Sequence, residues 1–295
     1  METNNIETSI KFSLVLCTLG RKDCVDSFLC SLEKQSYKKF ECIIVDQNES
    51  DMLLPIVDKY ASKFSVVYIR SSIKGLSKNR NIGVNRALGN VIAFPDDDCE
   101  YLPNTLEVMS RLFRETSNNI ITINIRDISS ERFFIKKHNL KHLDGYNYRP
   151  FGISIGIFVK YRKKSDVFFD EQLGVGSFFG ADEESDLLSS LIEKNYKAEF
   201  HGDIFVLHPI GVAHIPLDKL ILRYRSYGLG YGALYKKEIV YRHKYLLVLP
   251  FLKESIGRLL AGLLPVKKRK LYMVSALARI EGFLKYNRKN EKNIV

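Results

Sequence analysis

The sequence predicts an α/β protein with a mostly parallel sheet flanked by helices and a helical extension at the C-terminus. Short apolar runs alternate with segments of helical periodicity through the first hundred residues, which is the pattern of repeated βα units. The runs are nearly continuous in Val, Ile, Leu and Phe, as expected of strands that are buried on both faces. A chain of 295 residues, 45% of them hydrophobic, is long enough to bury one sizeable core.

The N-terminal part of the chain supplies most of the predicted sheet. Apolar runs that predict strands occupy residues 12–17, 41–46, 65–70 and 91–94. Segments with helical spacing of apolar residues occupy residues 23–35, 51–63 and 76–88, and Asp23 and Asp51 stand where N-caps are expected. Ligands of such open sheets bind beyond the carboxyl ends of the strands, so the polar residues after each strand are the first candidates for a site.

The pattern is less regular after residue 98. We expect, in order, a helix, a strand, an apolar run, a helix with an acidic start and a last strand, at residues 103–116, 119–126, 151–159, 187–195 and 205–208. The sequence divides into a first domain at residues 1–215 and a basic, Leu-rich and Tyr-rich helical tail at residues 216–295.

The net charge of +11 is concentrated in this tail. Residues 216–295 hold 18 Lys and Arg against 5 Asp and Glu, a net charge of +13, whereas the preceding residues have a net charge of −2. Proteins that bind nucleic acid usually carry their positive charge on the binding fold, so no nucleic acid partner is expected. The tail instead suggests an anionic membrane surface as a partner.

A Leu-rich segment at residues 245–265 lies within the tail. Lys253, Glu254 and Arg258 interrupt it and Pro250 is expected to break its helix, so it does not predict a membrane span. It is suited to the membrane interface, beside the basic cluster at residues 267–270. The alternative is a helical cap on the core with a solvated basic face.

The N-terminus and the cysteines suggest a reducing compartment. The first eleven residues are polar and lack the basic and apolar regions of a secretory leader. The five cysteines show no C-x-x-C spacing, which argues against a disulfide framework or a zinc site. We expect a cytoplasmic protein, with peripheral attachment to the inner face of the plasma membrane through the tail.

The strongest candidate site is the acidic run Asp96, Asp97 and Asp98, which follows the predicted strand at residues 91–94. Three adjacent carboxylates repel one another unless a cation or hydrogen-bond donors compensate them. Mg²⁺ and Mn²⁺ prefer such oxygen ligands and in turn bind phosphate oxygens. A solvated acidic turn is the alternative, and the buried run before the triplet favours the metal site.

Two other polar segments are candidates. Lys78 and Arg80 stand at the start of a predicted helix, where backbone N–H groups and cations favour a phosphate, although Arg80 could equally be an ordinary surface cation. Asp182, Glu183 and Glu184 begin another helix after a glycine-rich loop. The helix dipole favours acids in a first turn, which accounts for some of these carboxylates but not readily for all.

These segments occur in the order of a known family. Over residues 12–209 the chain resembles the inverting glycosyltransferases of family 2, which have the Rossmann-like GT-A fold, and particularly the bacterial enzymes of polysaccharide assembly. The resemblance implies that Thr18 and Arg21 belong to the first nucleotide loop. It also implies that Asp46 contacts the nucleobase or ribose, and that Lys78 and Arg80 assist the diphosphate.

The resemblance further implies a metal site and a base. Asp96 to Asp98 match the family's D-x-D element, so that Asp98 is the expected metal ligand and Asp96 serves both the metal and, with Asp97, the nucleotide. His208 falls on a histidine that is often a metal ligand in this fold. Glu184 falls on the general base, beside Glu183.

A loop ahead of that base also matches the family. Its members, which are expected to contact the donor or acceptor sugar, are Asp170, Gly176, Gly180 and Asp182. Two positions depart from the family pattern: Gln47 and Glu184 stand where many members have Asp. The first departure puts the nucleobase preference in doubt, whereas the second preserves a carboxylate.

The implied reaction is an Mn²⁺-dependent or Mg²⁺-dependent sugar transfer, hexosyltransferase-like, from a nucleoside-diphosphate donor such as a UDP-sugar. The implied acceptor is a hydroxyl of a glycan or lipid-linked glycan in the synthesis of capsule, O-antigen or a similar surface polysaccharide. A catalytically inactive glycan-binding or nucleotide-binding subunit and a sugar-nucleotide nucleotidyltransferase are the alternatives. The intact acids argue against the first, and the short loop after the opening strand argues against the second.

Overall fold

The computed structural model describes residues 9–136, 141–211, 215–266 and 268–288. The chain divides into two compact units. Among the described residues, the first unit consists of residues 9–74, 79–136, 141–168 and 187–210, and the second of residues 75–78, 169–186, 211, 215–266 and 268–288. The domain boundary expected at residue 215 stays a prediction.

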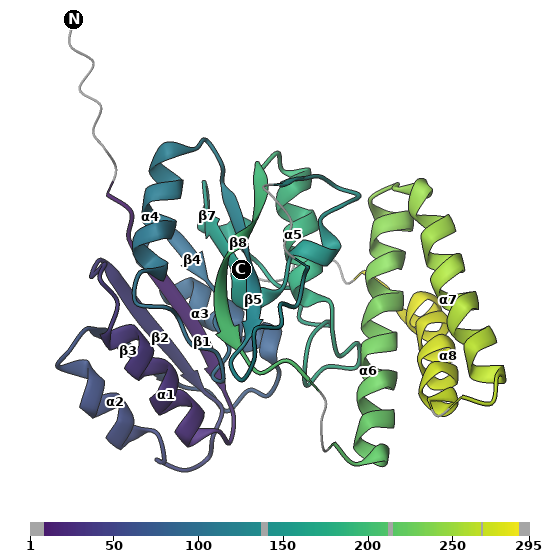
Figure 1. Ribbon diagram of the computed structural model, residues 1–295, viewed down its shortest axis with the longest axis horizontal. Coiled ribbons are helices and arrows are strands. Elements are labelled where there is room, and N and C mark those ends of the chain that lie inside the picture. Colours follow the sequence, from purple (N-terminus) through teal and green to yellow (C-terminus); the bar gives the residue numbers. More distant parts are fainter. Residues whose placement is uncertain (1–8, 137–140, 212–214, 267, 289–295) are drawn as a thin grey trace, which may run out of the picture. The chain divides into compact units, whose positions relative to one another are not determined.

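The first unit is built around one sheet. In the described residues this sheet has eight strands in the order β3-β2-β1-β4-β7-β5-β8-β6 (Figure 1). The strands are β1 (Phe12–Thr18), β2 (Phe40–Asp46), β3 (Ser65–Arg70), β4 (Val91–Ala93), β5 (Ile120–Asp127), β6 (Lys141–Leu143), β7 (Ile157–Lys160) and β8 (Ala198–His208). β1 is parallel to β2 and β4, and β5 is parallel to β8, whereas β7 runs against both β4 and β5. The carboxyl ends of β1, β2, β4 and β8 therefore lie at the same edge of the sheet.

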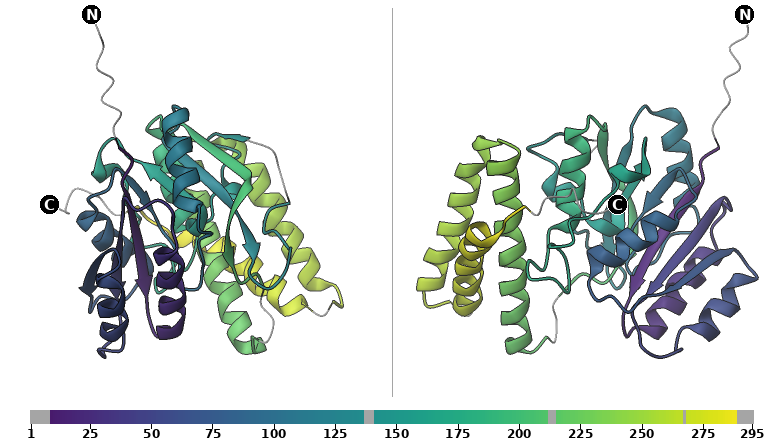
Figure 2. Two further views of the ribbon diagram at one scale, coloured as in Figure 1. Left: turned by 60° about the vertical axis from the view of Figure 1, so that its left-hand side comes forward. Right: turned by 180° about the vertical axis from the view of Figure 1, so that it is seen from behind.

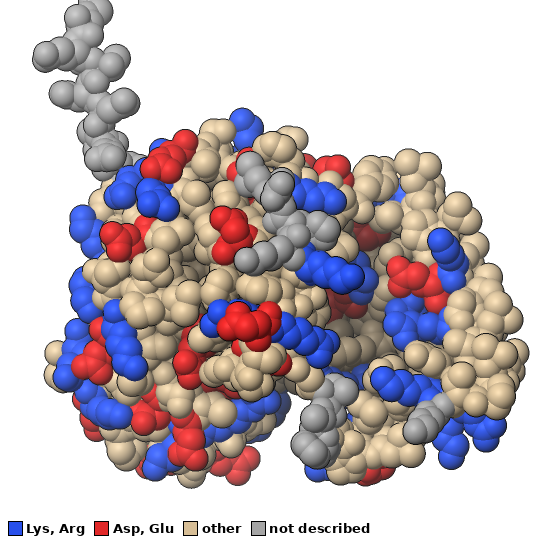
Figure 3. Space-filling view, in the orientation of Figure 1, with Lys and Arg blue, Asp and Glu red and all other residues tan. Residues whose placement is uncertain are grey.

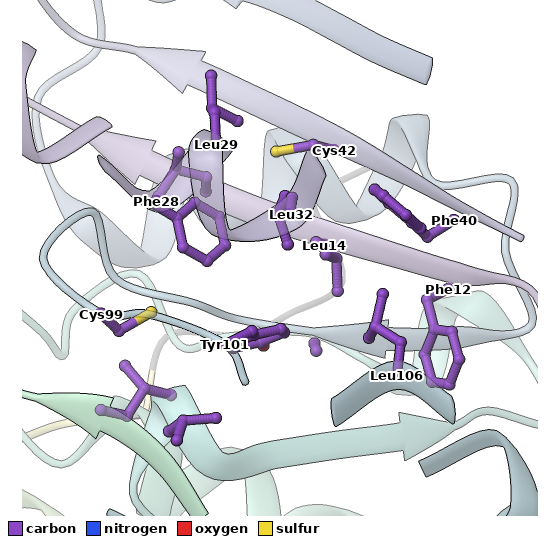
Figure 4. Close-up of a cluster of buried hydrophobic side chains, with 14 of the residues drawn as sticks. Phe12, Leu14, Phe28, Leu29, Leu32, Phe40, Cys42, Cys99, Tyr101 and Leu106 are labelled. Atoms are coloured by element: carbon purple, nitrogen blue, oxygen red, sulfur yellow. The ribbon is translucent and has the colours of Figure 1, made fainter. Parts of the chain in front are cut away.

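Helices cover the two faces of this sheet, because alternate residues of its strands point in opposite directions. On one face α1 (Lys22–Glu33), α2 (Leu54–Ala61) and α4 (Thr105–Glu115) pack on a core that includes Phe12, Leu14 and Phe40, part of which Figure 4 shows. On the other face α3 (Leu76–Arg86) lies against Val15. A Cβ atom at Gly83 of α3 would come within 2.3 Å of the Val15 side chain, so glycine permits this close packing. Figures 1 and 2 show α1 and α3 on opposite faces.

The predicted α/β architecture with a mostly parallel sheet is confirmed, and β6 and β7 run against their neighbours. Two local predictions need correction. The N-cap predictions are wrong: Asp23 lies inside the first turn of α1, and Asp51 precedes α2 and pairs with Arg70. The last strand is also longer than predicted and begins at Ala198.

The second unit contains the C-terminal helices α6 (Leu217–Lys236), α7 (Val248–Leu263) and α8 (Arg269–Lys285), with a π-helical turn at Lys237–Tyr241. Glycines let their backbones approach closely. A Cβ atom at Gly232 of α6 would lie 2.0 Å from the Arg279 carbonyl oxygen of α8, and one at Gly282 of α8 would lie 2.2 Å from the Leu229 carbonyl oxygen. Larger residues at either position would force the two helices apart.

The expectation that Pro250 breaks the helix of residues 245–265 is wrong. Pro250 lies in the first turn of α7, where its missing N–H would have no partner within the helix, so proline is tolerated there. No helix in the described parts of the chain has both the length and the apolar character needed to cross a membrane.

Candidate functional site

A backbone bridge brings the acidic run and His208 together. After β4 the chain turns through residues 96–99 and then pairs with the end of β8, where Glu100 N–H donates to the Leu207 carbonyl (2.8 Å) and Leu207 N–H donates to the Glu100 carbonyl (2.9 Å). This pairing holds His208 beside Asp98, with Nε2 3.1 Å from Oδ1. Two residues far apart in the sequence thus meet at the carboxyl edge of the sheet.

The loop after β1 holds Asp97. The Thr18 hydroxyl donates to Asp97 Oδ2 (2.6 Å), and Arg21 Nη1 donates to Asp97 Oδ1 (2.9 Å) and to Asp98 Oδ2 (2.6 Å). Asp97 is buried, which raises the pKa of its carboxyl group, although Thr18 and Arg21 oppose that effect. Asp97 is therefore held inside the fold, whereas Arg21 is half exposed above the two carboxylates.

Asp96 is held by Arg80 of α3. Arg80, which is only 1% exposed, places Nη2 3.2 Å from Asp96 Oδ1. Its guanidinium also lies 5.9 Å from the centre of the Phe94 ring. The alternative of an ordinary surface arginine is therefore wrong. Arg80 neutralises one face of Asp96 and leaves a carboxylate that is 39% exposed.

The geometry of Asp96, Asp98 and His208 fits a divalent cation. One ligand atom from each residue lies within 4.8 Å of the other two. Asp98 Oδ1 is buried, and within the described structure it receives no aligned hydrogen bond, although His208 is close. A neutral imidazole nitrogen and a carboxylate oxygen that face one another in this way form a donor set for Mn²⁺ or Mg²⁺.

The two groups also shift one another's pKa. Contact with His208 lowers the pKa of Asp98, against the opposing effect of burial. Burial acts to lower the pKa of His208, but the contact with Asp98 outweighs it and raises the pKa above its ordinary value. Each group thus stabilises the charged form of the other.

Asp46 lies at the end of β2 but is completely buried. Its carboxylate accepts hydrogen bonds from the Tyr68 hydroxyl (2.7 Å) and from the backbone and side-chain nitrogens of Asn48 (2.8 and 2.7 Å). Asn48 Oδ1 in turn accepts from Gly20 N–H (2.7 Å), which joins the loops that follow β1 and β2. The contact of Asp46 with a nucleobase stays a prediction. Asn48 and Tyr68 were not predicted from the sequence; Tyr68 reaches Asp46 because β2 pairs with β3.

The glycine-rich loop and the acidic motif belong to the second unit. Gly174 and Gly176 have positive φ angles (93° and 87°), which glycine adopts without strain. A Cβ atom at Gly174 would also lie 2.7 Å from the Ser77 hydroxyl, whose own hydrogen bond goes to the Leu173 carbonyl (2.7 Å). The loop therefore packs tightly on the first turn of α3, where Lys78 is exposed.

Helix α5 (Glu183–Glu193) begins with the acidic pair. Asp182 precedes it with a φ of 65°, Glu183 is buried and Glu184 is partly exposed. The preceding Gly180 contacts α6, because a Cβ atom there would fall 1.7 Å from the Ser226 hydroxyl. The tail helix thus packs directly on the segment that leads into the acidic motif.

A buried charge network joins this region to the π-helical turn. Lys237 Nζ lies 2.6 Å from Asp170 Oδ2 and 2.7 Å from Asp186 Oδ2. Arg242 pairs with Asp186 (2.8 Å) and with Glu238. Further contacts run from Lys244 to Glu238 (2.6 Å) and from the Tyr286 hydroxyl to Asp170 Oδ2 (2.5 Å). Among these residues three acids face three basic side chains, so their formal charges balance.

The network fixes the charge of Asp170. Burial acts to raise the pKa of its carboxyl group, but Lys237 and Tyr286 outweigh burial and lower the pKa below its ordinary range. Asp170 was expected to contact a sugar. The structure shows that its Oδ2 is held by the tail, and the sugar contact stays a prediction.

Sequence comparison identifies the family of this chain. The model of the family described as "Glycosyl transferase family 2" matches residues 13–173, more than half of the chain. The chain belongs to glycosyl transferase family 2. A curated relative, the poly(ribitol-phosphate) β-N-acetylglucosaminyltransferase TarS of Staphylococcus aureus, is 28% identical over 124 residues, which cover 41% of this chain and 22% of TarS. The cholesterol galactosyltransferase of Borreliella burgdorferi is 29% identical over 112 residues, 38% of this chain and 31% of that protein. The chain therefore spans less than a third of either relative.

Solved structures show the same fold as this family 2 chain. Residues 1–349 of S. aureus TarS superpose with a TM-score of 0.65 at 20% identity, covering 93% of this chain and 81% of that structure. The mannosyltransferase PcManGT of Pyrobaculum calidifontis, solved with GDP-Man and Mn²⁺, superposes with a TM-score of 0.62 at 13% identity, covering 95% and 88% of the two chains. The predicted GT-A fold is confirmed.

The predicted site residues of this chain fall into two groups. Thr18, Arg21, Asp96, Asp97, Asp98, Arg80 and His208 meet at the sheet edge of the first unit, as the ion pairs and hydrogen bonds above show. Lys78, Asp170, Gly176, Gly180, Asp182, Glu183 and Glu184 belong to the second unit. The individual catalytic and binding roles of both groups stay predictions.

Proposed function

We propose that the chain is a metal-dependent, inverting glycosyltransferase that uses a nucleoside-diphosphate sugar, and a UDP-sugar in particular. The observation that carries the proposal is the cluster of Asp96, Asp98 and His208, with the buried Asp98 Oδ1 among its donor atoms. Arg21 and Arg80 lie against the same carboxylates. Such a site combines cation ligands with positive charge, which suits a diphosphate leaving group.

Related proteins support a UDP-sugar and a role in surface polysaccharide synthesis. TarS structures have been solved in complex with UDP and with UDP-GlcNAc. Another relative is the amylovoran biosynthesis glycosyltransferase AmsB of Erwinia amylovora, which is 29% identical over 141 residues. The proposed acceptor is accordingly a hydroxyl of a glycan or of a lipid-linked glycan.

A lipid-linked acceptor would place the reaction at the inner face of the plasma membrane. One relative, from Campylobacter jejuni, is the GalNAc(5)-diNAcBac-PP-undecaprenol β-1,3-glucosyltransferase, 27% identical over 108 residues. The basic tail of this chain has a net charge of +13, which would favour its binding to an anionic lipid surface.

In the proposed reaction Glu184 acts as the general base. Its carboxylate takes the proton of the acceptor hydroxyl as the acceptor oxygen bonds to the anomeric carbon. The bond from that carbon to the diphosphate oxygen breaks, and its electron pair leaves with the nucleoside diphosphate. A single displacement of this kind inverts the anomeric configuration.

The first unit is proposed to hold the leaving group. Asp96, Asp98 and His208 would bind Mn²⁺ or Mg²⁺, and such an ion supplies electrostatic stabilisation of a departing diphosphate. Arg21 is half exposed and is proposed to contact a phosphate oxygen. Arg80 is buried and is proposed to orient Asp96.

The test is a screen of nucleotide sugars with the full-length chain, with and without Mn²⁺. We expect one donor to raise the melting temperature only when the cation is present, since a ligand that binds the native state stabilises it by mass action. The same donor should release nucleoside diphosphate once an acceptor is added. Metal-independent stabilisation by every active donor would contradict the proposal, and donor binding without any release would favour an inactive binding subunit.

A further inference from the structure

An apolar stripe runs along the solvent-facing side of α7, and the exposed Lys253 and Glu254 lie beside it. Five exposed aliphatic residues follow one another at spacings of three and four, which places them on one face of a helix. They are Leu249, Leu252, Ile256, Leu260 and Leu263, with exposed fractions between 45% and 73%. A helix of a folded unit normally turns such a stripe inward, so this stripe is oriented opposite to the usual arrangement.

The opposite side of α7 fixes this orientation. Phe251 is buried, with its ring 6.2 Å from Tyr231 of α6 and 5.1 Å from Phe283 of α8, both in stacked geometry. Ser255, one turn further on, is also buried. Rotating the helix to bury the leucines would remove these aromatic contacts, so the apolar stripe stays on the surface of the second unit.

Further apolar and basic side chains extend the stripe. Leu246 is 76% exposed just before α7, and Leu264 and Val266 are exposed after it. Lys268 and Arg269, with Lys270 next in sequence, are exposed where α8 begins. Figure 3 shows an uncharged surface along the outer, right-hand margin of the α7 region, with Lys and Arg side chains near the end where α8 begins. Lys267, the first member of the predicted basic cluster, lies outside the described residues.

The composition of this surface fits an anionic bilayer. An exposed apolar face bordered by cations is typical of helices that lie in the plane of the membrane interface. The 16 residues of α7 include Lys253, Glu254 and Arg258, so the helix is too short and too charged to cross the bilayer. A second copy of the chain is a poorer partner, because it would bring an identical tail of net charge +13 against this one.

We propose that the apolar face of α7 docks on an anionic lipid bilayer, with its leucines among the acyl chains and Lys268, Arg269 and Lys270 against the headgroups. The leucines supply the hydrophobic part of the binding free energy, and the cations supply a part that salt screens. Docking of this kind needs no donor, metal or turnover, so its outcome is independent of the transferase proposal.

The test is sedimentation of the full-length chain with vesicles of phosphatidylcholine alone and of phosphatidylcholine mixed with phosphatidylglycerol. We expect pelleting with the mixed vesicles that weakens as salt is raised. The triple variant Leu249→Asn, Ile256→Asn, Leu260→Asn should bind at least about tenfold more weakly, since each substitution removes buried methylene groups. The matched control is Leu88→Asn in the first unit, which alters a leucine with the same 73% exposure as Leu249 and should bind normally.

A second variant keeps the test decisive if the triple variant folds poorly. Reversing the charges with Lys268→Glu, Arg269→Glu and Lys270→Glu leaves the apolar face intact and should abolish the preference for phosphatidylglycerol. Unchanged pelleting of a folded triple variant would overturn the proposal. A second result would also overturn it: the wild-type chain does not bind vesicles but forms a dimer, and the triple variant is monomeric. The partner of the apolar face would then be a second copy of the chain.

Discussion

The acidic residues of the two compact units are compensated in different ways. In the first unit Asp96 and Asp98 remain partly exposed, and Asp98 Oδ1 is buried and receives no aligned hydrogen bond from the described residues. In the second unit Asp170 and Asp186 are more deeply buried and share the Lys237 ammonium group at 2.6 and 2.7 Å. Carboxylates of the first kind retain ligand capacity, whereas carboxylates of the second kind use theirs to hold the fold together.

Acidic residues within the motif at the start of α5 also differ in exposure and pairing. Glu184 is partly exposed at the start of α5, whereas Asp186, two residues later, is 5% exposed and paired. We therefore expect substitution of Glu184 to lower turnover, and substitution of Asp98 to lower both cation binding and turnover. Substitution in the Lys237 network should mainly lower the stability of the fold.

The largest effect is expected for Glu184→Gln. Removing a general base should lower turnover by about 10²–10⁴-fold, because the acceptor hydroxyl loses its proton acceptor. The measurement is nucleoside diphosphate release with a saturating donor. Donor-dependent thermal stabilisation should stay at the wild-type level, and Glu193→Gln at the other end of α5 is the control that should retain activity. Turnover near that of the wild type would remove Glu184 from its proposed role.

The next effect is expected for Asp98→Asn. Loss of a charged ligand should lower turnover by about 10²–10³-fold, because electrostatic stabilisation of the leaving group is lost. In contrast to Glu184→Gln, it should also abolish the increase in melting temperature on addition of Mn²⁺. Asp58→Asn, at an exposed position of α2, is the matched control. An Asp98→Asn protein with a normal Mn²⁺ response would show that the cation binds elsewhere.

A smaller effect, on stability, is expected for Lys237→Met. The substitution leaves Asp170 and Asp186 buried without their shared cation, which should reduce the free energy of unfolding by about 3 kcal/mol. Denaturant unfolding measures this change, with Lys219→Met at an exposed position of α6 as the control. A loss of turnover without a loss of stability would mean that Lys237 takes part in the site and not only in the fold.

The smallest effect is the contribution of Asp170 to the pH dependence of stability. Its folded-state pKa is lowered, so its contribution is complete above the unfolded-state pKa of about 3.9 and is lost as the pH falls through the folded-state value. Below about pH 4 the stability difference between the wild type and Asp170→Asn should therefore shrink. Unfolding curves at neutral and acidic pH measure it, and a difference that grows on acidification would contradict the pKa direction.

Much of the first unit could be predicted from sequence because its strands are local patterns. The runs at residues 12–17, 41–46 and 65–70 became strands within one residue of the predicted bounds. The strand at Ala198–His208 was mostly missed, because His201, Gly202 and Asp203 interrupt its apolar pattern and a register shift in its pairing with β5 accommodates them. The burial of Arg80 could not be predicted from the sequence either, because it depends on packing beside the Phe94 ring and the Asp96 carboxylate.

By itself, the sequence determined the alternation of strands and helices, the order of the acidic motifs and the concentration of positive charge in the tail. These are properties of spacing and composition, which need no knowledge of distant neighbours. Only the tertiary structure showed the β-bridge that brings His208 to Asp98, the pairing of Lys237 with Asp170 and Asp186, and the outward orientation of the leucines of α7. The reason is physical: a β-bridge, a balanced charge network and the packing of one aromatic ring each bring together residues that no local pattern relates.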